Sequence, residues 1–234
     1  MCLPPQIPEK ALGSREQYLF ESIREKRQHW AEAGASTEVL KWINPGVTIP
    51  WIAGPPTPFY KGKSLSDLTP EQDRWWAEER ERLVECGAWE RGGKREFVTK
   101  AFLVPKGPGK WRLVVDLRHL NSFVVDKTTK FETLKGLRRL AKKGDWMFSF
   151  DLADGYYALA IRPEDRKYFT VDVDGELFQF VGLPMGWNLS PHVFCKTMRT
   201  FVQEMRAPDA PTTGVLRRSG KRRRMLLREQ RGMR

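Results

Sequence analysis

Helix signals recur at four places along the chain. In the last of them, Ser190-Pro191 opens a stretch in which apolar residues return every three or four positions, as they do on one face of a helix. Thr69-Pro70-Glu71-Gln72 has the form of a capping box with proline at the first helical position. The four predicted helices cover residues 14–34, 69–87, 133–143 and 190–205.

Between the helices, short runs of β-branched and aromatic residues are separated by turn residues, a pattern typical of β-hairpins. Gly107-Pro108-Gly109 separates two such runs, and Asp174-Gly175 separates another two. The predicted strands cover residues 96–106, 110–118, 145–152, 169–173 and 177–181. Because hairpins alternate with single helices, the sequence predicts an α+β fold and not a parallel α/β sheet.

Residues 44–62 are rich in proline and glycine but keep Trp51, Phe59 and Tyr60. We expect an ordered, extended segment that lies over a surface and marks a boundary. The chain then divides into three parts. These are an N-terminal extension of one helix and the extended segment (1–68), a main body (69–205) and a tail (206–234).

The net charge of +12 suggests a phosphate-rich partner, but it is unevenly distributed. Residues 206–234 hold ten Lys or Arg and two acidic residues, a net +8, and the rest of the chain carries the other +4. We expect this basic tail to be mobile. Its run Lys221-Arg222-Arg223-Arg224 is compatible with a nuclear localisation signal or with a solvated end.

The three cysteines are far apart and odd in number, so the sequence predicts neither a disulfide framework nor a zinc site. No apolar run reaches the roughly 18 residues of a membrane span. The N-terminus also lacks the charged-then-apolar order of a signal peptide. We expect an intracellular protein, cytoplasmic or nuclear, that is not secreted.

Four motifs follow one another from about Leu83 to Met205. Taken alone, the strand-end Asp151 is more often a helix cap or a turn former than a metal ligand. In chain order, the motifs are Lys106 at a predicted hairpin tip, Trp111-Arg112-Leu113-Val114-Val115-Asp116-Leu117-Arg118-His119-Leu120-Asn121, Phe148-Ser149-Phe150-Asp151-Leu152-Ala153-Asp154-Gly155-Tyr156-Tyr157 and Gly182-Leu183-Pro184-Met185-Gly186-Trp187-Asn188-Leu189-Ser190-Pro191. This ordered series resembles the reverse transcriptases of retroelements, and its last motif is most similar to tyrosine-recombinase retrotransposons.

The resemblance implies the fingers and part of the palm of a right-hand polymerase, with Arg112 and Lys106 as cations for a nucleoside triphosphate. A planar guanidinium grips phosphate through paired donors, and lysine acts as a mobile point charge. For Lys106 the alternative is an ordinary turn lysine. Asp154, Tyr156, Met185 and Gly186 complete the implied nucleotide-binding set.

Tyr156 matches the position where a ring beneath the sugar excludes a 2′-hydroxyl, although plain core packing is the alternative reading. Several viral relatives have glutamine at the position of Met185. The methionine of this chain would therefore make a shape contact with the nucleotide in place of a hydrogen bond. Asp151 matches the first metal-binding aspartate, and the backbone carbonyl of Leu152 a second ligand of the two Mg²⁺ ions in the family's site.

The family's Tyr-x-Asp-Asp hairpin, which supplies two further aspartates, has no counterpart in this sequence. After Met205 the only acidic residues are Asp209 and Glu229. Since two Mg²⁺ ions need several carboxylates, we expect a fragment cut off before that motif and without polymerase activity. The 145–152 strand would then lose its neighbouring hairpin and expose an edge.

Two classes of function follow from these motifs. The first is an RNA-directed DNA polymerase domain of a retroelement, which adds deoxynucleotides to a primer and whose partners are an RNA or DNA template-primer and a deoxynucleoside triphosphate. The second is a non-catalytic RNA- or DNA-binding module. A decayed retroelement remnant without a selected role is a further alternative.

Overall fold

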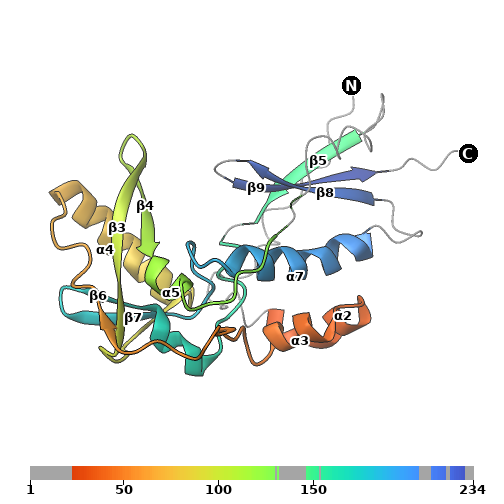
Figure 1. Ribbon diagram of the computed structural model, residues 1–234. Helices are drawn as coiled ribbons and strands as arrows, with labels where there is room; N and C mark the ends of the chain where they lie inside the picture. Colours follow the sequence, from red (N-terminus) through yellow and green to blue (C-terminus); the bar gives the residue numbers. More distant parts are fainter. Residues whose placement is uncertain are drawn as a thin grey trace, which may run out of the picture.

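The computed structural model describes residues 23–129, 131, 146–152, 154–205, 212–219 and 222–229 (Figure 1). It contains a larger sheet with α4 (Pro70–Glu85) packed against it, and a smaller sheet beside α7 (Ser190–Met205). The predicted helix at 133–143 lies outside the described residues. No helix in the described part of the chain is long and apolar enough to cross a bilayer.

The larger sheet contains both predicted hairpins. β3 (Phe97–Gly107) pairs antiparallel with β4 (Lys110–Asp116), and β6 (Thr170–Val173) with β7 (Glu176–Phe180). The second hairpin turns at Asp174 and Gly175, whose φ angles of 52° and 91° fit the residue types favoured in a tight turn. The α+β prediction is therefore confirmed in its hairpins.

Two parallel pairings in the same sheet were not predicted. β3 pairs parallel with β1 (Phe59–Tyr60) on one side and with β6 on the other. β2 (Trp89–Arg91) completes the sheet next to β7. The parallel pairs join segments that are far apart in the sequence, so no turn residues between them predict the pairing.

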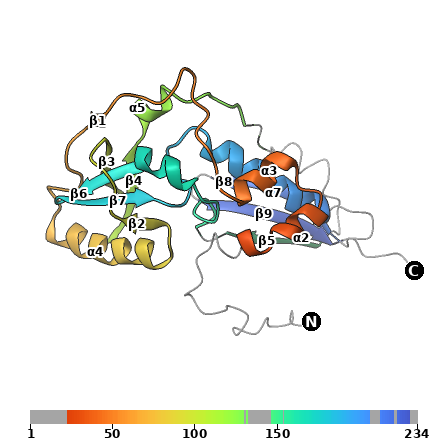
Figure 2. The same ribbon diagram turned by 90° about the horizontal axis from the view of Figure 1, so that it is seen from below.

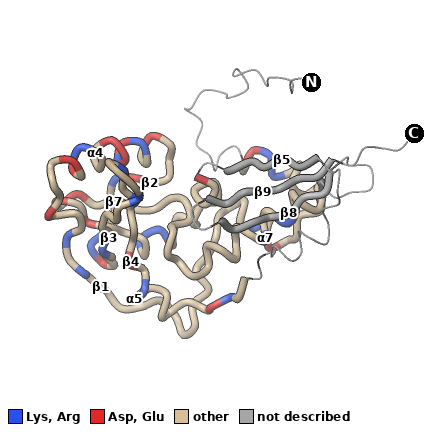
Figure 3. The backbone as a smooth tube through the Cα atoms, turned by 90° about the horizontal axis from the view of Figure 1, so that it is seen from above, with Lys and Arg blue, Asp and Glu red and all other residues tan. Residues whose placement is uncertain are grey.

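α4 begins and ends where its sequence signals indicate. The Thr69 side chain accepts from the backbone N–H of Gln72, and the Gln72 side chain accepts in return from the N–H of Thr69. Its buried Trp76 meets Trp89 of β2, with ring centroids 5.7 Å apart. The helix packs on β2 and β4 (Figure 2), while acidic and basic residues alternate along its length (Figure 3).

The smaller sheet has the order β5 (Trp146–Asp151), β9 (Arg222–Glu229) and β8 (Thr212–Ser219). The expected unpaired edge of β5 is not observed, because β9 pairs antiparallel with β5 along the whole length of β5; the mobility of 206–234 stays a prediction. The register sets Met225 opposite Phe150, and Leu227 opposite Phe148. Apolar cross-strand pairs of this kind stabilise a sheet, and the net charge of the tail concealed them.

The N-terminal segment is tied to the main body. The described part of the predicted 14–34 helix is helical over α2 (Arg27–Glu32), near Gly34 with its φ of 80°. α3 (Thr37–Ile43) follows and lies against α7, which separates it from β8 (Figure 1). The Glu38 carboxylate on α3 accepts hydrogen bonds from Lys196 on α7 and from Lys127. Lys196, and then Lys127, hold the pKa of this carboxyl below its usual value.

The extended segment that follows α3 is ordered and partly buried, as the sequence predicts. Val47 exchanges two backbone hydrogen bonds with the strand-like residues Ala160 and Arg162, each 2.9 Å long. The Ile49 N–H donates to the Asp165 carboxylate at 3.0 Å. Val47 and Ile49 belong to the main buried cluster, so residues 37–49 share its core.

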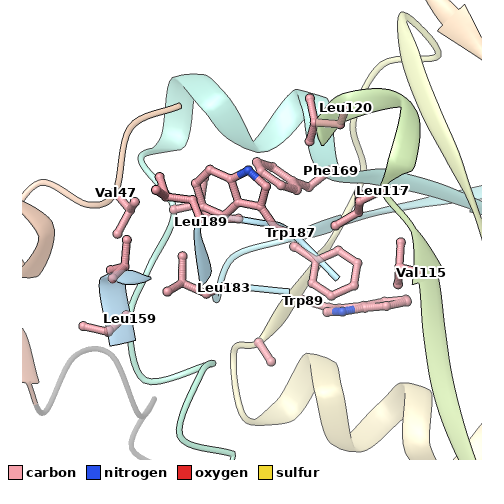
Figure 4. Close-up of a cluster of buried hydrophobic side chains, with 14 of the residues drawn as sticks. Val47, Trp89, Val115, Leu117, Leu120, Leu159, Phe169, Leu183, Trp187 and Leu189 are labelled. Carbon is pink, nitrogen blue, oxygen red and sulfur yellow. The ribbon is translucent and has the colours of Figure 1, made fainter. Parts of the chain in front are cut away.

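The main core lies between the larger sheet, α4 and the loop before α7. Trp187 is buried with its ring 5.0 Å from that of Phe169, at an angle of 70°. Figure 4 shows these rings together with side chains from β4, α5 (Arg118–Asn121) and the segment before α7. The labelled residues are Val47, Trp89, Val115, Leu117, Leu120, Leu159, Phe169, Leu183, Trp187 and Leu189.

Asp116, the last residue of β4, joins three segments of the larger lobe. Arg118 donates two side-chain bonds of 2.8 Å to its carboxylate, and Lys61 pairs with the same group. Arg118, and then Lys61, hold the pKa of this carboxyl well below its usual range. The ion pairs fasten β1, β4 and α5 to one another.

Because the folded-state pKa of Asp116 is depressed, its contribution to stability is complete above its unfolded pKa of about 3.9 and is lost as the pH falls below it. We therefore expect the difference in unfolding free energy between the wild type and Asp116→Asn to stay constant above about pH 5 and to shrink below about pH 4. Urea unfolding at a series of pH values measures this difference. A difference that stays the same down to pH 3 would contradict the assignment.

Candidate functional site

Asp151 ends β5, and a tight turn follows it. Leu152 is exposed, and Asp154 adopts a φ of 49°, a left-handed conformation that aspartate tolerates better than most residues. The Tyr157 N–H donates to the Asp154 carbonyl at 2.7 Å. The turn thus carries the chain from the strand-end aspartate to the two tyrosines within six residues.

The Asp154 side chain is held by α4. Arg82 donates to its carboxylate at 2.6 Å and to Glu79 through two bonds of 2.8 Å. Glu79, and then Asp154, raise the pKa of Arg82, which keeps the guanidinium charged. Asp154, predicted as a nucleotide-binding residue, is therefore engaged within the protein in this structure.

Tyr156 lies against the first turns of α7. Its ring meets Phe194 edge-on, with centroids 5.2 Å apart and planes at 89°. A Cβ added at the neighbouring Gly155 would lie 3.1 Å from the Phe194 ring, so glycine permits this close packing. The adjacent Tyr157 is partly buried, and desolvation raises the pKa of its hydroxyl.

The loop before α7 is fastened at both ends and displays Met185 between them. The Ser190 hydroxyl donates to the Pro184 carbonyl at 2.8 Å, and both residues are buried. Gly186 has a φ of 107°, and a Cβ there would lie 3.1 Å from the Val115 carbonyl of β4. Met185 is 54% exposed, unlike the buried Trp187 that anchors the loop.

Asn121 joins this loop to the end of the β3–β4 hairpin. Its side-chain amide donates to the Gly186 carbonyl at 2.8 Å, and its side-chain oxygen accepts from the Asn188 N–H at 3.1 Å. One side chain thus satisfies a backbone acceptor and a backbone donor on either side of Trp187. The loop position is set by β4 and α5 as well as by α7.

The two predicted cations lie on the β3–β4 hairpin. Arg112 is half-buried and opposes Val104 in the register, and Lys106 is exposed near the tip. Arg112 stands three residues before Val115, whose carbonyl contacts the Gly186 loop. The structure thus places Gly186 near the strand that carries Arg112 and places Tyr156 against α7, while Lys106 lies out at the hairpin tip.

The described acidic side chain nearest to Asp151 in the sequence, that of Asp154, is already paired. Asp154 is paired with Arg82, and the register places Arg224 of β9 opposite Asp151. No group of three or more His, Cys, Asp or Glu that suits a metal occurs among the described side chains. Two close divalent cations need several free carboxylates, which this arrangement does not provide.

Two residues with a clear role were missed from the sequence. Asn121 was seen only as the end of a motif, although an amide after a short helix is suited to bonding both a backbone donor and an acceptor. The sequence does not indicate which partner Arg82 has, because arginine and glutamate alternate along α4. Their partners lie 65 and 72 residues away in the sequence.

Removing the Asn121 amide tests whether it holds the loop. We expect Asn121→Ala to lower the free energy of unfolding by about 1–2 kcal/mol, since two hydrogen bonds to the loop are lost. Ser122→Ala is the matched control, because Ser122 bonds only the carbonyl of His119 in its own turn. Equal stability of the two variants in urea unfolding would contradict the role of Asn121.

Comparison with known proteins shows what this chain is similar to. Residues 104–212 match the family described as reverse transcriptase (RNA-dependent DNA polymerase). The Pol polyprotein of equine infectious anemia virus (strain Wyoming) is 31% identical over 149 residues, which are 59% of this chain and 13% of that protein. That of isolate 1369 is 31% identical over 126 residues, or 50% and 11% of the respective lengths.

A solved structure shares the fold. The crystal structure of the prototype foamy virus protease-reverse transcriptase superposes with a TM-score of 0.58 at 17% identity, covering 97% of this chain and 30% of that one. The predicted fingers and palm architecture is thereby confirmed at the level of the fold. Residues 104–212, somewhat less than half of the chain, therefore resemble a reverse transcriptase domain, and the chain is similar to a part of retroviral Pol polyproteins.

Proposed function

We propose that this domain belongs to a retroelement of the tyrosine-recombinase type and holds a template-primer and a deoxynucleoside triphosphate, but that the 234-residue chain does not polymerise by itself. The observation that carries the binding part is the junction of β4 with the Gly186 loop through Asn121 and the Val115 carbonyl. The proposed retroelement subtype rests on the sequence motif Leu183–Pro191 alone.

In this proposal, the hairpin and the loop form two sides of the nucleotide site. Arg112 supplies a fixed, half-buried cation for the triphosphate, and Lys106 a second one from the exposed tip. Met185 contributes shape contact to the base or sugar from a loop whose position is set on three sides. Tyr156, packed edge-on against Phe194, offers its ring as the floor beneath the sugar.

The proposed lack of polymerase activity rests on the acidic groups. Asp151 is the aspartate that matches the family's first metal ligand, and no pair of adjacent aspartates occurs in the 234 residues. Metal-dependent phosphoryl transfer needs more negative charge than Asp151 and the Leu152 carbonyl provide. No reaction step is therefore assigned to these residues.

A non-catalytic module that binds RNA or DNA is the second candidate. The observation that favours it is the concentration of basic residues in 206–234, which attract phosphate without any chemistry. Both candidates place the protein inside the cell, in the cytoplasm or the nucleus, where the nucleic acid is found.

Primer extension separates the two candidates. With an RNA template, a DNA primer and Mg²⁺, we expect the wild type to incorporate no more deoxynucleotide than Asp151→Ala. Fluorescence anisotropy with the same template-primer is the control, and it shows that both proteins bind this nucleic acid. Incorporation by the wild type clearly above that of Asp151→Ala would overturn the proposed inactivity.

Nucleotide binding has its own test. We expect Arg112→Ala to weaken the affinity for a deoxynucleoside triphosphate on the order of tenfold, because a charge-assisted contact to phosphate is lost. Lys100→Ala is the matched control, since Lys100 is an exposed cation on the same hairpin, paired in register with Asp116. Calorimetric titration in the presence of template-primer measures both. Equal losses of nucleotide affinity in Arg112→Ala and Lys100→Ala would show that Arg112 contributes only to the overall positive charge of the hairpin.

A further inference from the structure

The segment that leads into β1 is rich in proline. Residues 54–58 have the sequence Gly-Pro-Pro-Thr-Pro, in which Pro55 and Pro58 stand three positions apart. Proline fixes its own φ near −65°, and it holds the residue before it away from the helical region. Each residue of 55–58 is a proline or precedes one, and the structure shows these four residues without a turn or a bend. The segment therefore has the local constraints of a polyproline II helix.

The exposure of the side chains in this segment follows a period of three residues. A polyproline II helix has three residues per turn, so residues three apart share one face. Phe59 is half-buried, and its ring stacks on that of His119 with the centroids 3.8 Å apart. Pro56, three residues before Phe59, is half-buried as well, whereas Pro55 and Pro58 are both exposed. The face that is turned to solvent thus carries two prolines at the spacing Pro-x-x-Pro.

Backbone hydrogen bonds hold the segment at both of its ends. Before it, the Ile52 N–H donates to the Phe123 carbonyl at 2.9 Å, and after it the Phe59 N–H donates to the Glu96 carbonyl at 2.8 Å. Figure 2 shows the trace that leads into β1 on the outside of the larger sheet. A segment that is already fixed in an extended form loses little conformational entropy when a partner binds it. Residues 55–58 are therefore both accessible and preorganised.

The groups on either side of the prolines differ in character. Ile52, which precedes the segment, is 64% exposed. On the other side, Lys63 is exposed, and Lys61 pairs with Asp116 next to the Arg118 guanidinium. The three cations outnumber the one carboxylate at this end. A partner with an apolar groove and with acidic residues at one end of it is complementary to this surface in shape and in charge.

We propose that residues 55–58 are a docking site for a proline-recognition domain of the SH3 type. Domains of this class bind a polyproline II helix in a groove lined by aromatic side chains, and they use the low entropy of that helix. In this docking, Pro55 and Pro58 occupy the groove, and acidic residues of the partner lie near Lys63. The site needs neither a nucleotide nor a nucleic acid, so it is independent of the proposed function.

The test is the binding of the full chain to an array of purified SH3 domains, followed by titration of the domain that binds best. The docking variant is Pro55→Ala/Pro58→Ala. Its matched control is Pro70→Ala/Pro163→Ala, which removes two exposed prolines that each begin a helix elsewhere. Lys63→Glu reverses the charge beside the segment, and Lys110→Glu reverses the same charge at the exposed tip of the β3–β4 hairpin.

We expect Pro55→Ala/Pro58→Ala to bind the selected SH3 domain on the order of tenfold more weakly than the wild type. Lys63→Glu should bind about threefold more weakly at low salt, and this difference should shrink as the salt concentration rises. The two control proteins should stay close to the wild type. In a ¹⁵N-labelled SH3 domain, the chemical-shift changes caused by the wild type should lie in the aromatic groove.

Two further measurements separate docking from folding. Because Pro55 and Pro58 are exposed, the docking variant should melt close to the wild type. A synthetic peptide of residues 50–63 should compete with the full chain for the same groove. The peptide should compete more weakly than the unlabelled chain does, because the hydrogen bonds at both ends of the segment are absent from it.

Three results would overturn the proposal. The first is an array in which no SH3 domain binds the wild type, and the second is a docking variant that binds as tightly as Pro70→Ala/Pro163→Ala. The third is a set of chemical-shift changes that lies outside the aromatic groove. Each of these outcomes leaves the tests of Arg112 and Asp151 untouched, so this proposal and the proposed function fail separately.

Discussion

The candidate site depends on the bonds of one amide. Asn121 holds the backbone on both sides of Trp187 to the end of β4, and Gly186 permits the Val115 carbonyl to approach at a distance that a Cβ would not allow. This junction holds the loop that carries the exposed Met185 to the end of the strand that carries Arg112. α7 then extends the connection to Tyr156 through Phe194. Without Asn121, these elements would share a core but would have no fixed mutual register.

The second constraint is the balance of charge around Asp151. Enzymes that transfer phosphoryl groups with two metal ions surround the ions with carboxylates. Here Asp154 is neutralised by Arg82, and the strand next to Asp151 contributes arginine at the opposing position.

Local signals predicted much of this structure. The capping box of Thr69 and Gln72, the Asp174-Gly175 turn and the Ser190-Pro191 helix start are each determined by neighbours within four residues. The parallel pairing of β1 and β3 and the Asn121 bonds are long-range, so no local pattern reveals them. At 206–234 the charge concealed a weaker signal, the short apolar runs Val215-Leu216 and Met225-Leu226-Leu227 that fit strands. The order of the motifs predicted the candidate site residues, and the structure shows which neighbours hold several of them.

The account depends most directly on the pairing of β9 with β5 beside Asp151. Amide hydrogen exchange, measured on the full chain with and without a template-primer in EDTA, reports on this pairing. We predict that amides of residues 222–229 exchange slowly in the free protein, and that those of residues 183–189 exchange more slowly with the template-primer. Exchange of residues 222–229 at the rate of an unstructured peptide in both states would contradict the account.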